Sequence, residues 1–282
     1  MRVFAFLTLC LGLIGPFPAC AQTLEQKAQA LINAYPDYLA TFDGVNLIWK
    51  DGTSMPFGGG RADKTPQELL DRPDIADMFH WPYVFDGAAS PASLENDPGR
   101  VRNEAFFEKM YGDCDKRPAG ACASVKCVSG APLKNVPWVP KFSGGSMQAA
   151  SINGVGEKLR RVSQELEALG PSFAKYLVPS GGSYVPRCIA GTTRLSVHSF
   201  GIAVDINPQY GGYWQYGLPH AMSEDQVREK KTPLVYRNRI PIEIVKVFEK
   251  HGFIWGGNWY HFDGMHFEYR PEFLALKAIM SQ

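Results

Sequence analysis

The chain has 282 residues, with 29 lysines and arginines against 28 aspartates and glutamates. Its length is enough for one large domain or two small ones. The near-zero net charge gives no sign of binding to nucleic acid or to a charged membrane surface, so neither is expected as a partner.

Residues 1–21 have the pattern of a secretory signal peptide. Met1-Arg2 precedes an apolar run from Val3 to Ile14, and Ala19-Cys20-Ala21 supplies the small residues of a cleavage site. The run is too short to span a bilayer comfortably. We therefore predict cleavage after this triplet, export to a bacterial periplasm or the extracellular space, and no transmembrane segment in the mature chain. A lipid-modified cysteine within the triplet is the alternative.

Six cysteines are present, and two lie in the predicted signal peptide. The remaining four are Cys114, Cys122, Cys127 and Cys188. An even number in an exported protein favours two disulfides, for which three connectivities are possible. A zinc knuckle is the alternative, but the spacing fits no common finger. We expect one bridge within the cluster 114–127, and a second that ties this cluster to Cys188.

The N-terminal half contains two predicted helices. One covers residues 24–35, and the other begins at a capping box formed by Thr65-Pro66-Gln67-Glu68. Between them the chain is expected to form loops or short strands. A soft boundary near residue 135 divides an N-terminal region of unknown role, 22–135, from a second domain, 136–282. The N-terminal region can still pack on the rest as one unit.

The C-terminal half alternates helices and strands. A helix over residues 154–169 is expected to be capped by Asn153 and ended by Gly170-Pro171. The other expected elements are a buried strand at 202–206, a short helix opened at Ser223, a helix at 241–250, and a hairpin of strands 253–255 and 265–269. This mixture predicts an α+β fold with a small, mostly antiparallel sheet flanked by helices.

Two motifs near the C-terminus concentrate groups that can bind a metal. The first places Ser196, His198, Gly201, Ala203 and Asp205 in the pattern S-x-H-x-x-G-x-A-x-D, and the second is Asp263-Gly-Met-His266-Phe-Glu268. Two histidines and one carboxylate with an open fourth position form the ligand set of a catalytic zinc site. We predict His198, Asp205 and His266 as the ligands of one Zn²⁺ ion. The small residues between His198 and Asp205 are expected to let the backbone turn close to the metal.

A zinc-activated water also needs a base. Asp263 can project into the site from the turn of the hairpin. Glu268 is the alternative, because residues two apart on a strand point to the same face.

The two motifs resemble those of zinc metallopeptidases of bacterial cell walls, a family of D-alanyl-D-alanine carboxypeptidases and L-alanyl-D-glutamate endopeptidases. The resemblance covers about residues 140–275, and 22–135 match nothing assignable. It implies the same three zinc ligands, Asp263 as the base where relatives often have Glu, and an arginine that binds substrate and steadies the transition state. Arg187 is the best match for this arginine, and Arg194 is the rival.

The sequence is compatible with more than one role for several nearby side chains. His261 is expected to contact substrate, to support a ligand or simply to pack, and Ser196 to hold its loop by a local hydrogen bond. Aromatic residues such as Trp214 and Trp259 belong either to a cleft or to the core, and the loop 208–232 is expected to wall the site.

The sequence thus predicts an exported zinc peptidase that hydrolyses peptidoglycan stem peptides, as a carboxypeptidase or as an endopeptidase. A non-catalytic, metal-binding module that recognises the cell wall is the main alternative. A zinc peptidase for other D-amino-acid or protein substrates is a third possibility. The sequence indicates no oligomeric state.

Overall fold

A computed structural model describes residues 22–58, 63–86, 96–117, 124–129, 133–218, 222–230 and 232–282. The predicted signal peptide and Cys122 lie outside the described residues. Helices and small antiparallel sheets are mixed along the chain, so the predicted α+β class is confirmed. Among the described helices, none has both the length and the apolar character needed to cross a bilayer.

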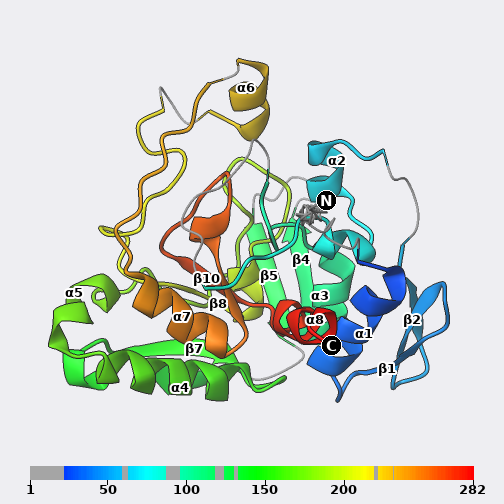
Figure 1. Ribbon diagram of the computed structural model, residues 1–282, viewed down its shortest axis with the longest axis horizontal. Helices are drawn as coiled ribbons and strands as arrows, with labels where there is room; N and C mark the ends of the chain where they lie inside the picture. Colours follow the sequence, from blue (N-terminus) through cyan, green and yellow to red (C-terminus); the bar gives the residue numbers. More distant parts are fainter. Residues whose placement is uncertain are drawn as a thin grey trace, which may run out of the picture.

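Figure 1 shows the arrangement of these elements. The α-helices are α1 (Leu24–Ala34), α2 (Pro66–Asp71), α3 (Glu104–Tyr111), α4 (Val155–Ala168), α5 (Ala174–Leu177), α6 (Glu224–Glu229), α7 (Ile242–Lys250) and α8 (Pro271–Met280). The strands are β1 (Leu39–Phe42), β2 (Asn46–Trp49), β3 (Ser54–Pro56), β4 (Gly112–Arg117), β5 (Ser124–Ser129), β6 (Leu133–Pro137), β7 (Ser146–Ala150), β8 (Ala203–Asp205), β9 (Phe253–Trp255) and β10 (His266–Tyr269). Helices α3, α5 and α8 were not predicted.

Local capping explains where several helices begin. Thr23, Thr65 and Ser223 each form a capping box, so the predicted starts of α1, α2 and α6 are confirmed. The predicted cap of α4 by Asn153 is wrong. Gly154 occupies the capping position, with a left-handed φ of 69° and no side-chain hydrogen bond to the helix. Asn153 is itself left-handed and belongs to the preceding turn.

The sheet that carries the second motif has the strand order β8-β10-β9, and all its pairings are antiparallel. The predicted hairpin of β9 and β10 is therefore confirmed, and β8 joins its other edge. Phe267 of β10 stacks on Phe248 of α7 with ring centroids 3.8 Å apart. Because side chains alternate along a strand, His266 and Glu268 point to the opposite face. His266 pairs with Asp205 across this sheet.

The N-terminal region packs against the rest of the molecule. Figure 1 shows α8 lying against α1, and both belong to one hydrophobic core that extends from Leu31 and Phe57 to Phe253 and Phe267. The predicted boundary near residue 135 falls inside β6, which pairs with β7. Burial of apolar surface across this junction favours a single folded unit.

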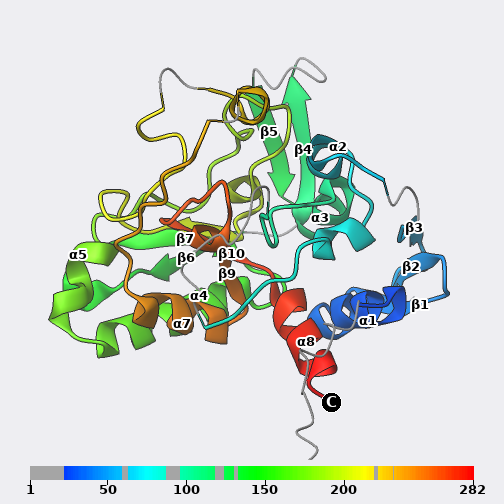
Figure 2. The same ribbon diagram turned by 45° about the horizontal axis from the view of Figure 1, so that its top comes forward.

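A disulfide joins Cys114 and Cys127, which are also paired across the hairpin of β4 and β5. This hairpin projects from the body of the molecule at the top of Figure 2. The expected bridge within the cysteine cluster is therefore present. Cys188 is disulfide-bonded as well.

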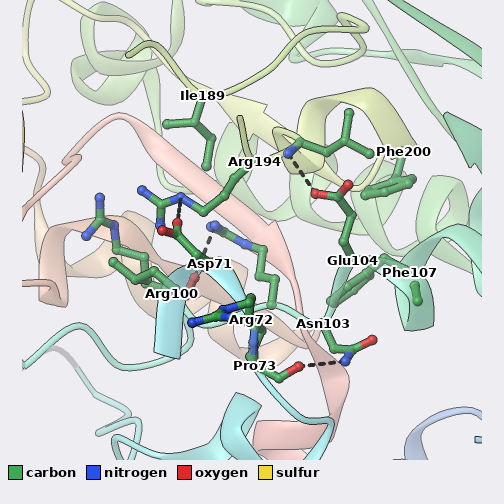
Figure 3. A pocket seen from close by; sticks show the side chains of 14 residues that line it. Asp71, Arg72, Pro73, Arg100, Asn103, Glu104, Phe107, Ile189, Arg194 and Phe200 are labelled. Atoms are coloured by element: carbon green, nitrogen blue, oxygen red, sulfur yellow. Dashed lines mark hydrogen bonds and ion pairs between the residues drawn. The ribbon is translucent and has the colours of Figure 1, made fainter. Parts of the chain in front are cut away.

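A cavity of about 170 Å³ marks one junction between the N-terminal region and the segment that leads to the first motif (Figure 3). Arg194 forms an ion pair with Asp71 at 3.5 Å, and the backbone N–H of Leu195 donates to Glu104 at 3.1 Å. The loop that precedes His198 is thus fastened to α2 and α3.

Candidate metal centre

The first motif forms a short 3-10 helix, Val197–Phe200, between two turns. Ser196 caps it by accepting a hydrogen bond from the backbone N–H of His198. Gly201 ends it with a left-handed φ of 67°, and a Cβ there would lie 2.8 Å from Leu133 and 3.1 Å from the backbone of Ala150. Glycine is therefore required by close packing against β6 and β7, and not by approach to the metal position as the sequence predicted.

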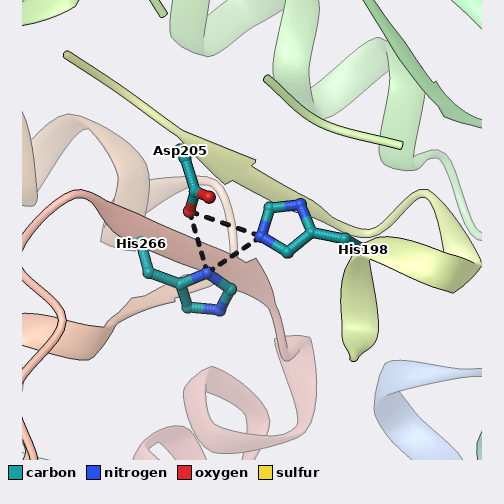
Figure 4. A group of neighbouring side chains, drawn as sticks. All are labelled: His198, Asp205 and His266. Carbon is teal, nitrogen blue, oxygen red and sulfur yellow. Dashed lines mark hydrogen bonds and ion pairs between the residues drawn. The ribbon is translucent and has the colours of Figure 1, made fainter. Parts of the chain in front are cut away.

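The structure brings the three predicted ligands together (Figure 4). His198 Nε2 lies 3.3 Å from Asp205 Oδ1 and 3.2 Å from His266 Nδ1. The third edge of this triangle, from His266 Nδ1 to Asp205 Oδ1, is 3.1 Å. Ligands about 2.0–2.1 Å from a tetrahedral zinc ion lie about 3.3 Å from one another. The triangle therefore has the size that one zinc ion requires.

Hydrogen bonds at the far side of each imidazole fix which nitrogen faces this triangle. His198 Nδ1 donates to the backbone oxygen of Ser183, which can only accept. His266 Nε2 donates to the Glu268 carboxylate at 3.0 Å. In the neutral rings the remaining nitrogens turn lone pairs toward Asp205. Three converging electron-pair donors repel one another unless a cation lies between them, so the donor set fits a metal ion.

The pKa values of His266 and Asp205 reflect the charges that surround them. Burial alone would lower the pKa of His266, but hydrogen bonds to Asp205 and Glu268 raise it to about 9. Burial alone would raise the pKa of Asp205, yet the neighbouring His198 and His266 hold it well below its usual range. The site therefore attracts positive charge, which a proton or a metal ion can supply.

Asp263 lies beside the triangle, in the turn between β9 and β10. Its backbone N–H donates to Gly256, and it forms an isolated bridge with Tyr213. Its Oδ1 atom is buried and has no hydrogen-bond partner among the described residues. Burial, and next the negative charge of Asp205, raise the pKa of Asp263 above the usual range of aspartate. A carboxyl group in this state is suited to accept and release protons.

Glu268, the rival base, is placed differently. It is fully buried and accepts hydrogen bonds from Arg102, Arg270 and His266. It does not line the cleft next to the metal position. Burial alone would raise the pKa of Glu268, but the charge of Arg102 holds it well below its usual range. Glu268 is therefore a poorer proton acceptor than Asp263.

The triangle opens into a cleft of about 280 Å³. Its lining includes Arg187, Tyr213, Trp214, Tyr216, Trp259 and His261. Arg187 is exposed and lines the cleft together with Asp263. Its positive charge opposes the rise in the pKa of Asp263. Arg194 is instead paired with Asp71 and Glu224 and does not line this cleft.

His261 lies in the wall of the cleft and is held from the N-terminal region. Its Nδ1 lies 2.8 Å from Asp97, and the same carboxylate accepts its backbone N–H at 2.9 Å. Its ring makes an edge contact with Trp214, with centroids 5.0 Å apart. Trp214 and Trp259 thus belong to the cleft, whereas Trp255 packs in the core.

Sequence reasoning missed the contribution of residues 96–102. Arg100 and Arg102 line the cleft, and Asp97 holds both Arg100 and His261. No local pattern marks their place at the cleft, because they are tied to it by partners far away in the chain, namely Glu224, His261 and Glu268. The closest signal was the alternation of charged residues at Glu268, Arg270 and Glu272, which calls for buried partners of opposite charge.

The donor set fits a metal-binding site that opens into a cleft. Residues 190–269 match the sequence profile of a family described as D-alanyl-D-alanine carboxypeptidase. The predicted resemblance is confirmed over this segment, which contains the three possible ligands and Asp263. The match supports a metallopeptidase of a family that acts on peptidoglycan. Comparisons with curated proteins and with solved structures gave no match.

Proposed function

We propose that the protein is an exported zinc peptidase that hydrolyses stem peptides of peptidoglycan. The observation that carries this proposal is the triangle of His198, Asp205 and His266 beside Asp263, whose Oδ1 atom has no hydrogen-bond partner among the described residues. Export is supported by the signal-like residues 1–21 and by the Cys114–Cys127 disulfide, since disulfides persist in oxidising compartments.

His198, Asp205 and His266 would hold the ion. Zinc bound there would activate a water molecule and polarise the scissile carbonyl. Asp263 takes a proton from the attacking water at its free oxygen and passes it to the leaving amine. Tyr213, Trp214 and Tyr216 line the cleft and would contact the substrate there.

Arg187 is proposed to bind a substrate carboxylate or the oxyanion that forms at the scissile carbonyl. Its guanidinium reaches the cleft and makes one long hydrogen bond, 3.4 Å to the backbone oxygen of Cys188, among the contacts of the described residues. Arg187→Ala should lower kcat/KM by about 10²-fold, the effect of losing one donor to an oxyanion. Arg187→Lys should restore only part of this loss. Steady-state kinetics on a stem peptide measure both, and unchanged kcat/KM in the alanine variant would exclude this role.

Digestion of purified peptidoglycan by the zinc-loaded mature protein, followed by mass spectrometry, tests the function. Loss of a terminal D-alanine supports a carboxypeptidase, and cleavage between L-alanine and D-glutamate supports an endopeptidase. If no stem peptide is cleaved, the proposal is wrong.

A non-catalytic module that binds the cell wall is the second candidate. It would keep the metal position for structural reasons. It would have no use for a buried carboxyl oxygen that lacks a hydrogen-bond partner among the described residues, because such an atom is costly to retain. The state of Asp263 therefore favours the enzyme.

A further inference from the structure

A row of buried charges leads away from the metal position toward the N-terminal region. Glu268, Arg270 and Glu272 follow His266 at every second residue and are fully buried. Alternate residues of a strand share a face, so His266 and Glu268 lie side by side. Ala203 pairs with Glu268 across the sheet.

Arg102 reaches Glu268 from the N-terminal region. Its Nε donates to Glu268 Oε1 at 3.1 Å, and a terminal nitrogen makes a second, short hydrogen bond to Oε2. Two parallel hydrogen bonds from one guanidinium fix the direction of a carboxylate as well as its distance. Arg102 is itself held by the backbone oxygen of Arg100 at 3.2 Å and by the ring of Trp259 at 5.6 Å.

The four charged residues behind His266 balance one another. Arg102 and Arg270 supply two positive charges, and Glu268 and Glu272 supply two negative charges, all linked by ion pairs. Buried ion pairs seldom add stability over apolar packing of the same volume. Their position directly behind a metal ligand therefore indicates a role in orienting it.

We propose that Arg102 is a positioning residue for the metal centre, acting through Glu268 on His266. Arg102 clamps Glu268, and Glu268 holds the Nε2–H of His266 so that Nδ1 faces the other two ligands. The inference rests on the proposed function only in taking His266 as a metal ligand. Arg102 lies outside the segment 190–269 that matches the family. The N-terminal region thus has a function: it completes the support of the metal site.

The test measures Zn²⁺ affinity of the mature protein without substrate, by competition with a chromogenic chelator. Arg102→Met should weaken affinity by about 10- to 100-fold, the usual effect of losing an outer partner of a metal-bound histidine. The absorption bands of the Co²⁺-loaded variant should shift as well. Arg102→Lys keeps the charge but not the two-pronged contact, so it should fall between Arg102→Met and the unmodified protein.

Arg72→Met is the matched control, since it removes one positive charge from a side chain of the same region that is 78% exposed. Circular dichroism of the metal-free variants shows whether each one folds. If Arg102→Met does not fold, the Zn²⁺ affinity of Arg102→Lys tests the proposal instead. Zn²⁺ affinity equal to that of Arg72→Met would overturn this role, even in a protein that cleaves stem peptides. Weakened affinity in a protein that cleaves none would support the positioning role and overturn the proposed function instead.

Discussion

Replacing Asp263 by Asn should lower kcat by about 10²- to 10⁴-fold, the contribution of a well-placed general base. The amide keeps the size and much of the polarity of the side chain but cannot take a proton from water. Burial and Asp205 raise the pKa of the native carboxyl, which improves its match to a proton that must be accepted and then released. Zinc content should remain at one ion per chain, because the three ligands are untouched.

Asp263→Glu is the informative companion variant. It keeps the acid but moves it outward by one methylene. Activity between that of the native protein and Asp263→Asn would show that placement matters as well as charge. Glu268→Gln should leave more activity than Asp263→Asn, since Glu268 does not reach the cleft. An Asp263→Asn protein with native kcat would remove the residue from the mechanism.

The grouping of the three proposed ligands could be predicted from the sequence because their relation is local to one small sheet. His266 pairs with Asp205 across β8 and β10, and His198 stands on the turn that enters β8. A motif of fixed spacing is enough to describe such a geometry. The same locality allowed the turn carrying Asp263 to be identified.

The surroundings of the ligands could not be predicted in the same way. Glu268 was a credible base because strand alternation alone places it beside His266, and only a partner 166 residues earlier, Arg102, gives it another role. Asp97 and His261 are 164 residues apart and depend equally on tertiary packing. The reason for a glycine at position 201 was also predicted wrongly. A small residue was expected there because of the metal, but the neighbours that exclude a side chain belong to β6 and β7.

Removing one metal ligand should abolish activity more completely than any other single change. His198→Ala takes away one corner of the triangle and leaves Asp205 and His266 to hold the ion alone. Metal catalysis supplies several kcal/mol of transition-state stabilisation, so kcat/KM should fall by about 10³-fold or more. Chelation should inactivate the native protein to the same degree, and added Zn²⁺ should restore the native protein but not the variant. His80→Ala, which removes an exposed histidine elsewhere, is the control.

The same variant has a readout that does not depend on any substrate. Zn²⁺ at 100 times its Kd should stabilise the native fold by about 2.7 kcal/mol, because it binds the folded chain and raises the temperature of unfolding. His198→Ala should show a much smaller rise at the same concentration, and His80→Ala should show the full one. Equal shifts in all three proteins would mean that Zn²⁺ binds elsewhere, and the three residues would lose their assignment as ligands.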